Sequence, residues 1–112
     1  MRVAIAMLMG LVLCSCGHGD AVPDGEAGRH VGQEITVEGR IAQVKVFRGG
    51  AEALDLGGRY PHQTLVIYIP AADVEGMPDY KEGEKIAVKG TVMLYKGGPQ
   101  IVVKSPGQIT EE

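Results

Sequence analysis

The sequence predicts an all-β domain, a small closed barrel of five strands with a short helical turn between the third and fourth. Three observations support this. Apolar and polar residues alternate with the two-residue period of strands. One strand-and-turn pattern occurs twice, beginning at Gly32 and at Gly83. The 112 residues suffice for one such domain, and with 4% aromatic residues and no Trp its core must be aliphatic.

The repeat defines the first and fourth strands. The sequences GQEITVEGRI (residues 32–41) and GEKIAVKGTV (83–92) both place a glycine, Gly39 or Gly90, on the inward face of a strand. Glycine at such a position predicts a strongly coiled strand. After each copy comes a second apolar stretch and a Gly-Gly turn, and a slip in the inward phase predicts a bulge near Ala42 and Gln43. The residues expected to point inward are Ile35, Val37, Ile41, Ile86, Val88 and Val92.

Shorter apolar runs supply the other three strands, at residues 53–56, 65–69 and 100–103. A single helical turn is expected over residues 71–76. Before the first strand, Asp24 is expected to cap another turn over residues 25–31, with Ala27 and Val31 on one face.

The amino-terminal segment resembles the signal peptide of bacterial lipoproteins. The apolar run from Val3 to Leu13 is too short to span a membrane, which takes about 20 apolar residues. The sequence Leu13-Cys14-Ser15-Cys16 is similar to a lipobox, with Leu three residues before Cys16 and a small residue directly before it. Cys14 fits less well because bulky Leu13 precedes it.

This resemblance implies a signal peptide at 1–15, a lipidated tether at 16–23 that begins with Cys16, and a folded domain at 24–110. It also implies a location on the bacterial cell envelope, facing the periplasm or the exterior, with the membrane as a partner through the lipid.

The cysteines have two other conceivable roles. Cys14, Cys16 and His18 have a spacing that metal ligands can use, but zinc sites usually need a second pair of ligands. A Cys14–Cys16 disulfide would close too small a loop to stabilise a fold. We therefore expect no metal and no cofactor.

The order of the predicted elements resembles that of the OB fold, a five-stranded Greek-key barrel. More narrowly, the sequence is similar to small exported bacterial OB domains that are grouped with nucleic-acid-binding OB proteins of the anticodon-binding or helicase-associated type. That resemblance implies a non-catalytic binding module. The motifs that carry it are Val31-Gly32, Val37-x-Gly39-x-Ile41, Leu54-x-Leu56-Gly57 with Tyr60-Pro61, Val88-x-Gly90-x-Val92, and Tyr95-x-Gly97-x-Pro99-x-Ile101.

Catalysis is the weaker interpretation. Beyond the signal segment the chain has one serine, Ser105, and its histidines share no ligand spacing. Nucleases do occur on OB-like barrels, where carboxylates bind a metal beside arginines. Glu38, Arg40 and Asp55 could serve in this way, but Glu38 and Arg40 fall on the outward phase of an alternating strand, where charged residues form the solvated face.

A binding groove is expected over the second and third strands, flanked by two hairpins. Cations there could contact phosphates while aromatic rings stack on bases, as single-stranded nucleic acid requires. A net charge of −3 argues against binding by blanket neutralisation of phosphates, although it allows local basic patches. An envelope saccharide, a peptide or a protein partner is the alternative, and Phe47 and Tyr95 could instead close the barrel ends. The candidate groove residues are Lys45, Phe47, Arg48, Arg59, Tyr60, Tyr68, Tyr95 and Lys96.

Overall fold

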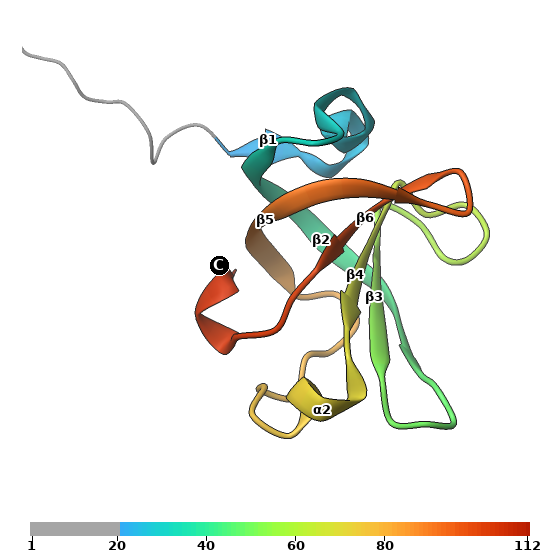
Figure 1. Cartoon of the computed structure of the whole chain (residues 1–112), viewed down its shortest axis with the longest axis vertical. Coiled ribbons are helices and arrows are strands. Elements are labelled where there is room, and N and C mark those ends of the chain that lie inside the picture. The colour runs from blue at the N-terminus through green and yellow to red at the C-terminus, as the bar shows by residue number, and fades with distance from the viewer. Residues whose placement is uncertain (1–20) are drawn as a thin grey trace, which may run out of the picture.

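A computed structural model describes residues 21–112 and shows a closed barrel (Figure 1). Its strands follow the order β2-β3-β4-β6-β5, and pairing of β2 with β5 closes the ring. All neighbours are antiparallel except β4 and β6. This confirms the predicted five-stranded Greek-key barrel of OB type. The strands are β2 (Glu34–Val46), β3 (Glu52–Leu56), β4 (Leu65–Ile69), β5 (Lys85–Tyr95) and β6 (Gly98–Val102).

Strand β2 serves both halves of the barrel. Its first part, from Glu34 to Arg40, pairs with β5, and its second part, from Ile41 to Val46, pairs with β3. The register shifts between Ile41 and Gln43. The bulge predicted near Ala42 is therefore confirmed, and it marks the point where the strand passes from one partner to the other.

The two inward glycines occupy crowded positions, as the repeat predicted. A Cβ at Gly39 would lie 3.0 Å from Asp24 Oδ1 and 3.1 Å from Leu56 Cδ1. At Gly90 it would lie 2.5 Å from Ile101 Cγ2. The missing side chains allow the strands to coil tightly around the core.

The core is aliphatic except for Tyr80, which is also buried in it. Val37, Ile41, Ile86, Val88 and Val92 are buried as predicted, whereas Ile35 is partly buried against the core. Strands β3, β4 and β6 contribute Leu54, Leu56, Leu65, Ile67, Ile69 and Ile101 to the core.

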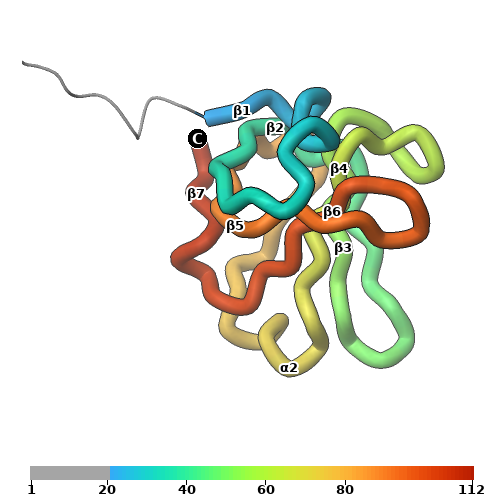
Figure 2. Tube along the Cα trace, turned by 45° about the horizontal axis from the view of Figure 1, so that its top comes forward, coloured from blue at the N-terminus to red at the C-terminus, as the bar shows by residue number. Residues whose placement is uncertain are grey.

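Short helices lie at opposite ends of the barrel (Figures 1 and 2). Helix α2 (Ala71–Val74) follows β4, where a turn was predicted over residues 71–76. At the other end is the 3₁₀ helix η4 (Asp24–His30), whose Ala27 is fully buried.

Two details of η4 differ from the prediction. Asp24 makes no capping hydrogen bond, because its carboxylate instead accepts a hydrogen bond from the Thr64 hydroxyl. Val31 is exposed rather than packed beside Ala27. The Asp24–Thr64 contact fastens η4 to the loop between β3 and β4.

Two short strands and a second 3₁₀ helix extend the barrel. Strand β1 (Val22–Pro23) pairs in parallel with β2, so the structure places in a strand two residues that the sequence analysis assigned to the tether. Strand β7 (Ile109–Glu111) pairs with β5 after η5 (Pro106–Gln108). Within residues 21–112, no helix is long and apolar enough to cross a membrane.

Candidate ligand-binding groove

A groove of about 900 Å³ lies on the outer face of the barrel. Its floor is formed by residues of β2, β3 and β4, and its walls by the β3–β4 loop (residues 57–64) and the β5–β6 hairpin. Figures 1 and 2 show this loop and this hairpin side by side at one end of the barrel. This is where the OB topology predicted a ligand groove.

The structure brings six of the eight predicted groove residues together. Lys45 and Phe47 come from the end of β2 and the residue after it, and Tyr68 comes from β4. Tyr60 stands on the β3–β4 loop, and Tyr95 and Lys96 stand on the hairpin. The lining residues that sequence reasoning missed include Pro61, Gln63, Pro99 and Gln100.

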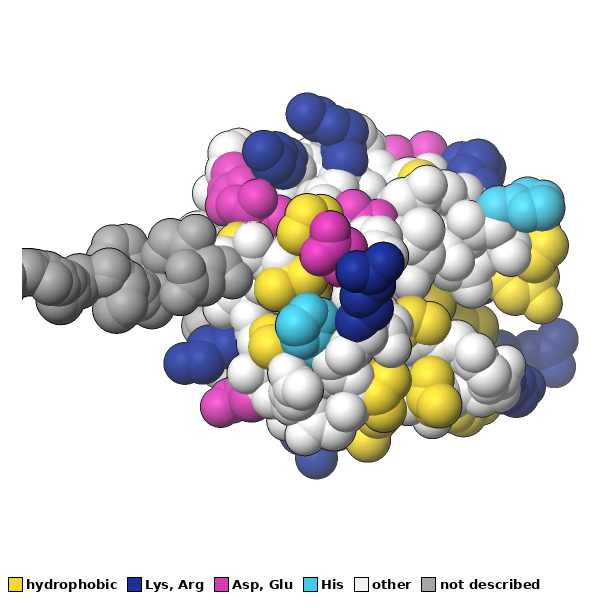
Figure 3. Space-filling model, turned by 90° about the horizontal axis from the view of Figure 1, so that it is seen from above, with side chains coloured by type: hydrophobic (Ala, Val, Ile, Leu, Met, Phe, Trp, Pro, Cys, Tyr) yellow, Lys and Arg dark blue, Asp and Glu magenta, His cyan; other side chains and the backbone are white. Residues whose placement is uncertain are grey.

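Three of the four aromatic rings of the groove face solvent, and Tyr68 is half-buried. Tyr60 is 62% exposed, Tyr95 57% and Phe47 44%, so Phe47 and Tyr95 do not close the barrel ends. The Phe47 and Tyr68 rings contact one another in a tilted arrangement, with centroids 6.4 Å apart. Seen from above, hydrophobic side chains gather on the right of the molecule with basic side chains at their edge (Figure 3). Exposed rings of this kind can stack on planar or ring-shaped ligand groups.

Each of the two groove lysines lies near an aromatic ring. Lys45 Nζ is 4.2 Å from the Tyr60 centroid and 6.0 Å from that of Phe47. Lys96 Nζ is 5.4 Å from the Tyr95 centroid, and its backbone has the left-handed φ of 53° at the hairpin turn. Cation–π attraction favours both arrangements. Each positive charge of the groove therefore lies beside the ring of a tyrosine.

Asp55 of β3 pairs with Lys45 and is fully buried. Its side chain lies on the outer face of β3, since its neighbours Leu54 and Leu56 belong to the core. Lys45 Nζ is 3.6 Å from Asp55 Oδ2, and neither carboxylate oxygen has a hydrogen-bond partner among the described residues. Burial raises the pKa of Asp55, and the charge of Lys45 opposes that rise. Asp55 therefore lies on the outer face of β3 and is nevertheless shielded from solvent.

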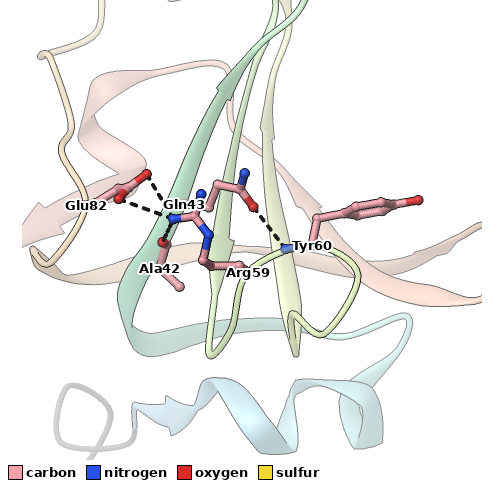
Figure 4. Close-up of polar contacts among 5 residues, drawn as sticks. All are labelled: Ala42, Gln43, Arg59, Tyr60 and Glu82. Atoms are coloured by element: carbon pink, nitrogen blue, oxygen red, sulfur yellow. Dashed lines mark hydrogen bonds and ion pairs between the residues drawn. The ribbon is translucent and has the colours of Figure 1, made fainter.

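Arg59 and Arg48 do not line the groove. Arg59 Nη1 donates to Ala42 O at 3.3 Å and lies 3.4 Å from Glu82 Oε1. The neighbouring Tyr60 extends in the opposite direction, and its backbone N–H donates to Gln43 Oε1 at 3.0 Å (Figure 4). These contacts attach the loop to β2 through Arg59 and leave Tyr60 to face the groove. Arg48 lies in the β2–β3 turn.

No hydrogen bond or ion pair joins Glu38, Arg40 and Asp55, the three residues that could have served nuclease chemistry. Arg40 Nη1 donates to Gly83 O at 2.8 Å, while Asp55 pairs with Lys45. Between residues 21 and 112 no group of three or more histidine or acidic side chains is arranged to hold a metal ion. The groove can therefore bind a ligand by ring stacking, by hydrogen bonding and through the charges of Lys45 and Lys96.

Comparison with solved structures supports the fold. A Leishmania major protein assigned as an aspartyl-tRNA synthetase aligns with a TM-score of 0.62 and 14% identity, over 92% of this chain and 22% of that chain. The Stn1–Ten1 complex of S. pombe aligns with a TM-score of 0.54 and 17% identity, over 70% and 57%. OBody AM3L15, bound to hen egg-white lysozyme, aligns with a TM-score of 0.59 and 16% identity, over 86% and 96%.

This chain spans less than two thirds of the length of the first two proteins. The sequence matches no protein-family model and no curated protein. At these identities the likeness establishes the fold. The strand order and the structural neighbours together show that residues 21–112 form an OB fold.

Proposed function

We propose that this domain is a non-catalytic OB binding module whose groove binds single-stranded nucleic acid. The observation that carries the proposal is the convergence of four aromatic side chains and two lysines in one groove over β2, β3 and β4. Stacking on exposed rings tolerates any base, and lysines contact the phosphates that join the bases. Two of the similar structures are named as a tRNA synthetase and as the Stn1–Ten1 complex, which agrees with a binding module of this fold.

The charge of the groove limits how such a ligand can bind. Among the described residues that line it, only Lys45 and Lys96 are positively charged. With about 0.7 per phosphate contact for single strands, log affinity should fall by no more than about 1.4 per decade of salt. If Arg48 and Arg59 also contacted phosphates, the largest expected fall in log affinity per decade of salt would be twice as large. Most of the binding free energy must therefore come from stacking.

The test is a titration of the purified protein with fluorescent single-stranded oligonucleotides and with duplexes of the same sequence, at about 50 mM salt. We expect the single strands to bind more tightly, because paired bases cannot stack on protein rings. Failure of every oligonucleotide to bind under these conditions, where electrostatic attraction is strong, would exclude this function.

We also propose that Cys16 anchors the protein to a bacterial envelope through lipid. Cys16 lies outside the described residues, so support comes from the sequence Leu13-Cys14-Ser15-Cys16 alone. Cys16→Ala should abolish acyl labelling and membrane association, and Cys14→Ala is the matched control. If Cys14→Ala abolishes both and Cys16→Ala does not, the assigned lipidation site is wrong.

One observation favours a second candidate, an uncharged saccharide, a peptide or a protein partner. The buried Asp55 carboxylate offsets the charge of Lys45, which weakens attraction for a polyanion. OBody AM3L15 is bound to a protein, hen egg-white lysozyme. Envelope glycan fragments and envelope extracts, titrated beside the oligonucleotides, distinguish these ligands. An uncharged glycan would need the same rings and would bind with little dependence on salt.

A further inference from the structure

Asp55 has an unusual position for a carboxylate. Among the residues that the structure describes, it is the one polar or charged residue that is buried. It is not part of the groove lining, but its partner Lys45 is. Burying a carboxylate without hydrogen bonds costs free energy, and a single cation 3.6 Å away compensates for part of that cost. An apolar side chain at this position would avoid the cost altogether.

Lys45 connects this buried charge to the ligand surface. Its side chain is 29% exposed, with the ammonium group near Asp55 Oδ2 and also 4.2 Å from the Tyr60 ring centroid. Attraction to Asp55 limits the directions that this long side chain can take. It also reduces the positive potential that Lys45 presents to a ligand. In contrast, no carboxylate of the described residues lies within 4.0 Å of Lys96.

We propose that Asp55 is a positioning and specificity-determining residue, which holds Lys45 beside Tyr60 and offsets its charge so that the groove selects single strands by base stacking more than by phosphate charge. This inference rests on the proposed function. It divides the groove into a nearly neutral stacking site at Tyr60 and a cationic site at Lys96. The native protein should then show a salt dependence close to that of one phosphate contact, about 0.7 per decade.

The experiment compares three variants with the native protein. Asp55→Asn keeps the size of the side chain and removes its charge. Asp55→Asn combined with Lys45→Gln removes both charges, which avoids leaving an unpaired carboxylate buried as Lys45→Gln alone would. Asp79→Asn makes the same change in net charge at an exposed ion pair with Lys81 and is the matched control. Oligonucleotide affinity is measured from about 50 mM to about 500 mM salt.

Asp55→Asn is expected to tighten binding by roughly fivefold to tenfold at about 50 mM salt and to steepen the salt slope by about 0.7, because a second lysine becomes available to phosphate. The double variant should lose that gain, and Asp79→Asn should match the native protein. A folded Asp55→Asn protein with native affinity and slope would overturn the proposal, and so would weaker binding with an unchanged slope.

A second readout needs no nucleic acid. Methylene protons of Lys45 held beside the Tyr60 ring should be shifted upfield in NMR spectra of the native protein and should move toward ordinary values in Asp55→Asn. Unchanged Lys45 shifts would contradict the positioning role. If the native protein and Asp55→Asn both fail to bind oligonucleotides while the shifts behave as expected, the proposed function and the selection of single strands are wrong, and only the positioning of Lys45 stands.

Discussion

The ammonium group of Lys45 lies 4.2 Å from the centre of the Tyr60 ring, so a residue of β2 and a residue of the β3–β4 loop form one surface. The loop that carries Tyr60 is attached to β2 on its other side, through Arg59 to Ala42 and through the Tyr60 backbone to Gln43. Because this attachment fixes the loop, the ring is placed before any ligand arrives. Preorganised rings lose less conformational entropy on binding.

Loss of an exposed ring should weaken binding without changing its salt dependence. Tyr60→Ala and Tyr95→Ala are each expected to weaken oligonucleotide binding by about 1–3 kcal/mol, since stacking releases no counterions. Leu94→Ala is the control, because Leu94 is 60% exposed on the same hairpin but does not line the groove. Fluorescence anisotropy over a salt series measures both quantities. Equal effects of Leu94→Ala and Tyr95→Ala would contradict a specific stacking role.

The basic residues should separate into two groups. Lys96→Gln is expected to reduce the salt slope by about 0.7, because it removes a phosphate contact. Arg59→Gln should leave the slope unchanged, since Arg59 lies against Glu82 and outside the groove. The same anisotropy series tests both variants, and a reduced slope in Arg59→Gln would mean that this side chain leaves Glu82 to contact the ligand.

Gly90 should tolerate no side chain. An added methyl group would lie 2.5 Å from Ile101 Cγ2 in the core, so Gly90→Ala is expected to lower the free energy of unfolding by about 1–3 kcal/mol. Gly49→Ala is the matched control, because an added Cβ at Gly49 meets no atom within 4 Å. Urea denaturation measures both, and equal midpoints in the two variants would contradict the crowding at Gly90.

The buried Asp55 carboxylate predicts a pH effect on stability. Burial raises the pKa of Asp55 in the folded state above the ordinary value of 3.8. At pH values between the ordinary pKa and the folded-state pKa, the folded state therefore binds more protons than the unfolded state. The contribution of Asp55 to stability is therefore present below pH 3.8 and is lost as pH rises through the folded-state pKa. Asp55→Asn should be more stable than the native protein at neutral pH and no more stable near pH 3, as measured by urea denaturation. Lower stability of this variant at neutral pH would contradict the sign.

The sequence predicted the barrel well because its signals there are periodic. The repeat around Gly39 and Gly90 located the two coiled strands, and the phase slip at Ala42 located the bulge between Ile41 and Gln43. Strand β1 was missed because it has only two residues, Val22 and Pro23, which are too few to show the alternation of apolar and polar residues. The role of Asp24 was missed because its partner Thr64 is distant in sequence.

The candidate groove was only partly predictable, for a physical reason. Alternation in β2 and β4 placed Lys45 and Tyr68 on the outer face, but the conformation of the β3–β4 loop decides where Arg59 points. The sequence pattern gave no indication that Asp55 is buried on the outer face of β3, because neighbouring chain segments provide the cover.

The most direct test is an NMR titration of the purified protein with a short single-stranded oligonucleotide, following every backbone amide. We expect the largest shift changes at residues 45–47, 60–68 and 95–100, which contain all the residues that form the groove except Ala53. Residues around Arg40 and Gly83, joined by a hydrogen bond outside the groove, should change little. Shift changes centred on that region, or no changes at saturating oligonucleotide, would contradict the proposal that this groove binds nucleic acid.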